Sequence, residues 1–189
     1  MTGYFRAHFT EHARVVEESI SELEQKSAAS ANALVTALGG GNKVLTFGNG
    51  GSSAEASHLA EELVGRFRKT RRPFPAISLS SDSGTVTCIS NDFGYEALFE
   101  RQIEAFVQPG DVAVALTTSG KSENVVRALR LARERGAVTI ALTGAEGLTG
   151  AEADHVLAVP SSDSAYIQEV HLMLIHVWCE AVDAALGTT

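Results

Sequence analysis

Apolar side chains recur at intervals of three and four positions through the first part of the chain. Phe5, Phe9, Val16, Ile20 and Leu23 follow helical spacing, and acidic residues fill many positions between them. Three glycines and an asparagine at 39–42 then interrupt the pattern. The pattern predicts one long helix over residues 4–38. Its apolar stripe needs cover, and a matching helix from another subunit is a natural source.

From residue 43 onwards, short apolar runs alternate with stretches of helical periodicity. Strands that alternate with helices and are apolar along their length are typical of a parallel sheet covered on both faces. The expected fold is α/β, a three-layer α/β/α sandwich. We expect a single domain over 1–189, with the long helix at 1–40 and an α/β core at 41–189. The expected strands are 43–47, 75–79, 111–116, 137–142 and 155–159, and the expected helices are 54–67, 83–90, 95–107, 122–135 and 164–186.

Composition narrows the class of protein. The chain has 189 residues, 44% of them hydrophobic, and a formal net charge of −8, which argues against nucleic acid as the main partner. Cys88 and Cys179 are too few for a disulfide framework and fit a reducing compartment. The N-terminus lacks the basic and apolar runs of a signal peptide, and no apolar run is long enough for a membrane helix. We therefore expect a cytoplasmic protein.

The first stretch with candidate chemistry is Gly48-Asn49-Gly50-Gly51-Ser52, between an expected strand and an expected helix. Its glycines allow close approach of the backbone to a ligand, and the N–H groups of the following helix can bind an anion. The segment matches neither the dinucleotide-binding fingerprint nor the P-loop. A phosphate cradle and a tight turn with serine caps both remain open.

A second loop places four hydroxyl groups around Gly120 at the end of another expected strand. One hydroxyl would cap the following helix, but four exceed what capping needs. A phosphate has several acceptor oxygens that hydroxyls and helix N–H groups can satisfy. We therefore favour a phosphate site over a polar capping loop. The four residues are Thr117, Thr118, Ser119 and Ser122.

Two helices carry candidate metal ligands. His58 and Glu62 are four residues apart and share one helix face. Gln168 and His176, eight residues apart, lie about 80° apart around the last helix. Glu169 and His171 compete with these two, and spacing alone does not choose. A set of two histidines, a carboxylate and an amide would suit zinc or a similar divalent ion, whereas a solvated His58–Glu62 surface pair is the alternative.

Four segments together resemble phosphoheptose isomerases of the sugar isomerase (SIS) superfamily: GNGGSSAEASHLAEELVGRF at 48–67, SLSSDSGTVTCISNDFGYE at 78–96, LTTSGKSENVVRAL at 116–129 and VPSSDSAYIQEVHLMLIHVWCEAVD at 159–183. The resemblance implies a flavodoxin-like sandwich and a homotetramer with active sites at subunit interfaces. It implies conversion of sedoheptulose 7-phosphate to an aldose, D-glycero-D-manno-heptose 7-phosphate. No nucleotide cofactor is implied.

The resemblance also assigns roles to residues. It implies substrate contacts through Asn49, Gly50 and Gly51 of the glycine loop, and through Asp92 and Gln168. It places the phosphate on Ser52, Thr117, Thr118, Ser119 and Ser122. The implied zinc ligands are His58, Glu62, Gln168 and His176, and the implied proton-transfer residues are Glu62 and His176. A glutamate bound to zinc is a weaker base, so whether Glu62 is base and ligand at once stays open.

The chain departs from the family pattern at four positions. Thr117 replaces a serine, Lys121 replaces an asparagine, and Ser164 and Tyr166 stand where threonine and arginine are usual. The missing cation at 166 leaves open which phosphosugar or which epimer is used. Other readings are a non-catalytic SIS protein that binds another protein, and a sugar-phosphate-sensing regulator. Retention of all four candidate ligands argues against the first of these, and the acidic charge with no visible DNA-binding segment argues against the second.

Overall fold

The computed structural model describes residues 2–148 and 152–187, and within them a five-stranded parallel sheet has the order β2-β1-β3-β4-β5. The expected domain range of 1–189 also includes residue 1 and the ranges 149–151 and 188–189, which lie outside the described residues. The strands are β1 (Val44–Gly48), β2 (Ala76–Ser78), β3 (Val112–Thr117), β4 (Val138–Gly144) and β5 (His155–Val159).

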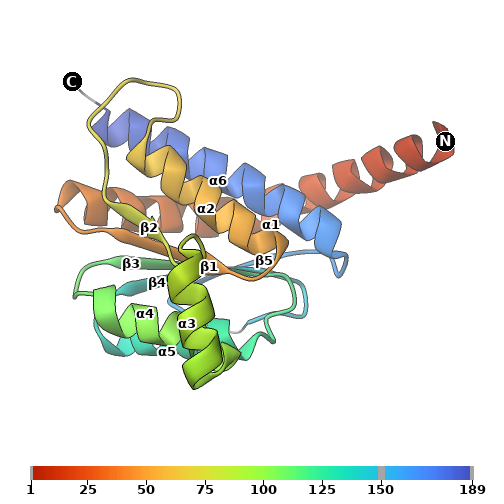
Figure 1. Ribbon diagram of the computed structural model, residues 1–189. Coiled ribbons are helices and arrows are strands. Elements are labelled where there is room, and N and C mark those ends of the chain that lie inside the picture. The colour runs from red at the N-terminus through yellow and green to blue at the C-terminus, as the bar shows by residue number, and fades with distance from the viewer. Residues whose placement is uncertain (1, 149–151, 188–189) are drawn as a thin grey trace.

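Helices cover both faces of this sheet (Figure 1). They are α1 (Thr2–Gly39), α2 (Gly51–Val64), α3 (Ser83–Phe93), the 3-10 turn η1 (Tyr95–Ala97), α4 (Leu98–Phe106), α5 (Glu123–Glu134) and α6 (Ser164–Leu186). Among the described residues, no helix combines the length and apolarity that crossing a membrane requires.

The expected fold class is confirmed, and the boundaries of the last strand and last helix are as predicted. Two helices differ from the prediction: the one expected at 54–67 begins at Gly51 and ends at Val64, and the one expected at 83–90 continues to Phe93. Glycines before a helix are typical of a loop, but Gly50 takes the N-cap position with φ 56°, a conformation that glycine adopts without a steric penalty. The loop after β1 is therefore only two residues long, which brings the N-terminus of α2 close to the strand end.

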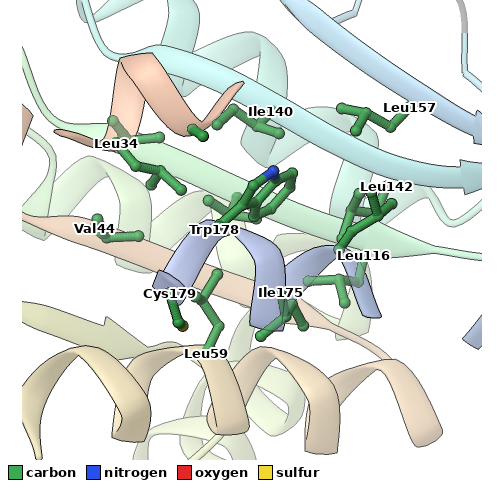
Figure 2. Packing of buried hydrophobic residues seen from close by; sticks show 14 of the residues in the cluster. Leu34, Val44, Leu59, Leu116, Ile140, Leu142, Leu157, Ile175, Trp178 and Cys179 are labelled. Carbon is green, nitrogen blue, oxygen red and sulfur yellow. The ribbon is translucent and has the colours of Figure 1, made fainter. Parts of the chain in front are cut away.

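The two faces of the sheet bury different side chains. On β3, Val112, Val114 and Leu116 face the layer of α1, α2 and α6, whereas Ala113 and Ala115 face the layer of α3, α4 and α5. Figure 2 shows the first of these cores, with Trp178 of α6 in its centre. Because α6 is buried between α1, α2 and the sheet, its side chains are held in place on several sides.

The strand order creates a switch point between β1 and β3. From β1 the chain crosses to β2 on one side, and β3 then lies on the other side. In open parallel sheets, ligands bind outside the carboxyl ends of the strands at such a point. The glycine loop follows β1 and the hydroxyl loop follows β3. The fold thus places both candidate loops at the switch point.

A buried ion pair connects the end of α2 to α6. The Arg71 Nε donates to Asp183 Oδ1 at 2.8 Å, and the two side chains are 0% and 4% exposed. Asp183 Oδ2 also accepts the backbone N–H groups of Arg68 and Lys69. Burial would raise the pKa of Asp183, but these hydrogen bonds outweigh burial and leave that pKa below its usual value. The charge of Asp183 is therefore part of the folded state.

We predict that Asp183→Ala lowers the free energy of unfolding by about 3–5 kcal/mol, because it leaves the Arg71 guanidinium buried without its counter-charge. Urea denaturation followed by circular dichroism measures the effect. Glu134→Ala, at an exposed position near the end of α5, is the control and should change stability by less than about 0.5 kcal/mol. Equal effects of the two substitutions would show that the pair does not hold the fold.

Candidate active site

The glycine loop is packed too closely for side chains at two positions. A Cβ at Gly48 would lie 2.8 Å from the Leu116 carbonyl oxygen and 2.9 Å from that of Ser52. A Cβ at Gly51 would lie 2.5 Å from Nε2 of Gln168. These glycines therefore let the first turn of α2 pack directly against β3 on one side and against α6 on the other.

Asn49, between these glycines, is held by two side chains from elsewhere in the chain. Its Oδ1 accepts hydrogen bonds from Tyr95 Oη at 2.8 Å and from Asn124 Nδ2 at 3.0 Å. Its Nδ2 donates to Asn124 Oδ1 at 2.9 Å. Tyr95 belongs to η1 and Asn124 to the first turn of α5, so Asn49 joins the ends of β1 and β3 to η1.

Ser52, Glu55 and Gln168 form a second polar group where α2 faces α6. Ser52 is 3% exposed, and its Oγ accepts a 3.4 Å hydrogen bond from Gln168 Nε2. The Oε2 atom of Glu55 is buried without a hydrogen-bond partner among the described residues. Burial raises the pKa of Glu55 to about 7, and the Ser52 hydroxyl offsets only part of that effect. Ser52 thus lies under the loop surface, in contact with a carboxyl group that titrates near neutrality.

The candidate metal ligands of α2 and α6 come together further along the same interface. His58 Nε2 lies 3.1 Å from His176 Nε2 and 3.6 Å from Glu62 Oε1. The other ring nitrogen of His58, Nδ1, lies 3.3 Å from Glu61 Oε1. His58 thus has an imidazole nitrogen from α6 and a carboxylate oxygen from its own helix as neighbours, and both donor types suit a divalent ion such as zinc. Ligand atoms of His58, Glu61 and Glu62 all lie within 4.8 Å of one another. A carboxylate beside Nδ1 is the usual way in which a ligating histidine is oriented.

The structure separates the competing residues on α6. Glu169 faces α1, where its carboxylate oxygens lie 2.9 Å from His8 Nε2 and 2.7 Å from His12 Nδ1. His171 is fully buried with Nε2 3.3 Å from the Thr143 carbonyl oxygen, and burial lowers its pKa to about 4. Gln168 and His176 are the residues that face α2. Of the residues left open by spacing, the structure thus turns Gln168 and His176 toward α2, with Gln168 against Ser52 and His176 against His58.

The hydroxyl loop borders a hollow of about 140 Å³. Thr117 Oγ1 accepts the N–H of Gly120, and Ser119 Oγ accepts the N–H of Lys121. Ser122 takes the N-cap position of α5, yet in the described part of the chain its side chain makes no capping hydrogen bond. The hollow is lined by Thr118, Ser119, Lys121, Ala145, Glu146, Ser161, Ser162 and Ser164.

These contacts favour a ligand role over capping. A hydroxyl oxygen that accepts a backbone N–H keeps its own hydrogen for an outside acceptor. The hydroxyls of Thr117 and Ser119 are in this state, and that of Ser122 is not used as a cap. Thr118 and Ser119 line the hollow, whereas Ser122 and the 5% exposed Thr117 are not among its lining residues. The lining hydroxyls and the N–H groups at the N-terminus of α5 can donate to the oxygens of a phosphate. Lys121 adds a positive charge at the rim of the same hollow.

Two predicted positions are not joined to these groups. Asp92 lies near the end of α3, where its carboxylate accepts from Asn91 Nδ2 at 2.7 Å and lies 3.7 Å from Cys88 Sγ. Tyr166 stacks beside His8, with ring centroids 4.8 Å apart. Ser164, by contrast, donates to Thr118 Oγ1 at 3.2 Å and lines the hollow.

The sequence did not identify the residues whose side chains contact and orient the predicted site residues. Tyr95 and Asn124 are far from Asn49 in the chain, and no spacing rule connects them. Glu55 gave a usable signal, because it lies seven residues before Glu62 and hence on the same side of α2. Glu61 also stands beside Glu62, but only the structure shows its contact with His58.

We predict that Glu55→Gln stabilises the metal-free protein at pH 8 and changes its stability little at pH 4.5. The folded-state pKa of Glu55, about 7, exceeds the value of 4.5 for a free glutamate, so its contribution to stability is complete below pH 4.5 and is lost as the pH rises through 7. Glutamine removes this loss, and thermal melts at pH 8 should show an increase of about 2–4 °C. The exposed Glu134→Gln is the matched control, and a pH-independent difference for Glu55→Gln would contradict the assignment.

Comparison with known proteins agrees with the family resemblance seen in the sequence. A family model described as the SIS domain matches residues 7–144. The phosphoheptose isomerase of Aquifex aeolicus is 51% identical over 176 residues, which are 93% of this chain and 92% of that protein. The phosphoheptose isomerase of Geotalea daltonii is 46% identical over 187 residues, 98% of this chain and 97% of that protein.

Solved structures give the same result. A phosphoheptose isomerase from Neisseria gonorrhoeae aligns with a TM-score of 0.91 at 36% identity, covering 97% of this chain and 98% of that one. A phosphoheptose isomerase from Francisella tularensis aligns with a TM-score of 0.92 at 34% identity, again covering 97% and 98%. By its sequence, its fold and the matched length, the chain belongs to the SIS-domain family, among the phosphoheptose isomerases.

Proposed function

We propose that this protein converts sedoheptulose 7-phosphate to D-glycero-D-manno-heptose 7-phosphate. Sugar-phosphate isomerisation follows from the family, and the particular heptose is the proposal. The observation that carries it is the contact of His58 with His176 and Glu62, with the two Nε2 atoms 3.1 Å apart, on the helix that follows the glycine loop. A group able to move protons and a phosphate cradle are the two parts that such a reaction needs.

In this proposal the hydroxyl loop binds the phosphate. The hydroxyls of Thr117, Thr118, Ser119 and Ser122 donate to its oxygens, with the N-terminus of α5 behind them. This grip lies away from the reacting carbons, so its binding energy fixes their position. Gly50 and Gly51 let the substrate approach the backbone of the first turn of α2. Ser52 is buried beside Glu55. Its main role in this proposal is to order that turn, and it contributes less to direct contact with the substrate than the exposed hydroxyls do.

A zinc or similar divalent ion would be held by His58, Glu62, Gln168 and His176. When bound, it would polarise the substrate carbonyl and stabilise negative charge on the neighbouring oxygens. Support comes from the donor set itself and from Glu61, which lies beside Nδ1 of His58 and leaves Nε2 for the ion. Because Gly51 has no side chain, the Gln168 amide can lie directly against the first turn of α2.

Proton transfer is assigned to Glu62 and His176. The isomerisation moves one hydrogen from C1 to C2 or back and one proton between the two oxygens, through an enediol or enediolate. The Glu62 carboxylate takes the proton from carbon and returns it to the adjacent carbon. The His176 imidazole, which can both accept and donate a proton, moves the proton between the oxygens. Phe67 stacks on the His176 ring at 5.5 Å and limits its rotation.

A different phosphosugar or heptose epimer is the second candidate. The observation behind it is Tyr166, which stands where the family has arginine and stacks beside His8. The positive charge expected there is missing, while Lys121 adds one at the hollow. This change in the position of the positive charge would favour a substrate whose acidic or polar groups are arranged differently from those of sedoheptulose 7-phosphate.

We expect the protein to act as a homotetramer. An apolar groove of about 530 Å³ lies between α1 and α6, and two of its lining side chains, Ile20 and Val177, are 63% and 51% exposed. Figure 1 shows the first turns of α1 extending beyond the rest of the chain. They carry exposed Tyr4, Phe5 and Phe9, an aromatic surface that helices of further copies can cover.

We predict that the wild-type protein, given zinc and sedoheptulose 7-phosphate in D₂O, produces an aldose with deuterium at C2. Glu62→Gln should lower kcat by at least about a thousandfold, because the base is lost, while phosphate affinity is retained. NMR measures the product and its epimer, and calorimetry measures the affinity for inorganic phosphate. Glu134→Gln is the control. Normal turnover by Glu62→Gln would remove that residue as the base, and absence of wild-type turnover would favour another phosphosugar.

We predict that Val177→Glu converts the tetramer to smaller species, because it places a charge in the centre of the α1–α6 groove. Light scattering after gel filtration measures the mass. Phe106→Glu, at an exposed apolar position on α4 on the other face of the sheet, is the control and should leave the mass unchanged. A wild-type monomer would overturn the expected assembly.

A further inference from the structure

The side chain of Asn49 is enclosed by three hydrogen bonds, and this geometry determines what it offers to a ligand. We call Asn49, Tyr95 and Asn124 the Asn49 clasp. Tyr95 Oη donates to Asn49 Oδ1 at 2.8 Å, and the two asparagine amides form a reciprocal pair at 2.9 and 3.0 Å. All three distances lie in the range of well-formed hydrogen bonds.

Counting donors and acceptors shows that Asn49 has one group left. An amide oxygen has two acceptor sites, and both are taken, one by Tyr95 and one by Asn124. An amide nitrogen has two hydrogens, and one is donated to Asn124. Within residues 2–148 and 152–187, the remaining N–H is the only hydrogen-bonding group left on the Asn49 side chain. Toward a ligand, Asn49 is therefore a donor and not an acceptor.

The clasp also fixes where this N–H lies. Asn49 follows β1 directly, and Asn124 is two residues past Ser122 at the start of α5. Asn124 is 3% exposed, so the amide pair is anchored in the interior, whereas Tyr95 closes it from the half-exposed side. The clasp thus spans the switch point. It connects the glycine loop after β1 to the hydroxyl loop after β3.

We propose that Tyr95 and Asn124 are positioning residues that hold the Asn49 amide with its N–H toward an acceptor oxygen of the sugar phosphate. This inference rests on the proposed function and deepens it. Isomerisation develops negative charge on the oxygens of C1 and C2, and a donor fixed beforehand stabilises such charge without reorganising. An unclasped asparagine would present its carbonyl oxygen part of the time and would repel the same oxygen.

The test is a double-mutant cycle on the full-length protein loaded with zinc, with sedoheptulose 7-phosphate as substrate. Tyr95→Phe removes a single hydroxyl and keeps the ring, so it should lower kcat/KM by about three- to tenfold, the effect of one neutral hydrogen bond. Its melting temperature should stay that of the wild type. In the Asn49→Ala background the same substitution should change kcat/KM by less than about twofold, because Tyr95 acts only through Asn49. Glu134→Gln, at an exposed position at the end of α5, is the control and should have no effect.

Two results would overturn the proposal. One is an unchanged kcat/KM for Tyr95→Phe, and the other is an equal loss in both backgrounds, which a general structural role would produce. The wild-type rate tests the proposed function separately. If the wild type does not convert this substrate, the same cycle is measured as calorimetric affinity for sedoheptulose 7-phosphate. Additive losses of affinity, or no binding at all, then overturn the clasp, and non-additive losses support it.

Discussion

The ion pair between Arg71 and Asp183 determines how the two helices of the site lie against each other. Besides Asp183, the Arg71 guanidinium donates to the carbonyl oxygens of Leu63 and Glu62, in the last turn of α2, at 2.9 and 2.7 Å. One cation therefore binds the free carbonyls at the helix end and the carboxylate of α6 at the same time. Asp183 lies seven residues after His176, on nearly the same side of α6. The pair consequently keeps Glu62 and His176 in register, although it takes no part in the chemistry.

At the other end of the α2–α6 interface, close packing and not an ion pair joins the two helices. Gly51 has no side chain, so Gln168 comes against the first turn of α2, and Ser52 and Glu55 fill the space below. The two helices are thus joined by an ion pair at one end and by close backbone contact at the other. Between these two attachments lie the histidines. A net charge of −8 does not prevent anion binding here, because hydroxyl side chains predominate in the lining of the hollow, which holds one lysine, Lys121, against one carboxylate, Glu146.

The sequence was sufficient to predict a strand or helix where a local pattern of residues determines that element. The strand at 155–159 and the helix at 164–186 follow from apolar runs and periodicity, and the structure has both. It was insufficient for the start of α2, because glycines in a helix cap look like glycines in a loop. It was also insufficient for choosing Gln168 over Glu169. These neighbours point about 100° apart, and only the packing of α6 between α1 and α2 decides which of them faces α2. The partners of Asn49 depend on topology in the same way.

The loops after β3 and β4 touch through their backbones. A Cβ at Gly120, whose φ is 67°, would lie 2.6 Å from Cα of Gly147, and a Cβ at Gly147 would lie 1.7 Å from Thr143 Oγ1. Neither position can accept a side chain while this contact exists. Lys121, next to Gly120, is by contrast exposed at the rim of the hollow. Evolution can therefore exchange the residue at 121, and with it the charge shown to an incoming ligand, without disturbing the loop that carries it.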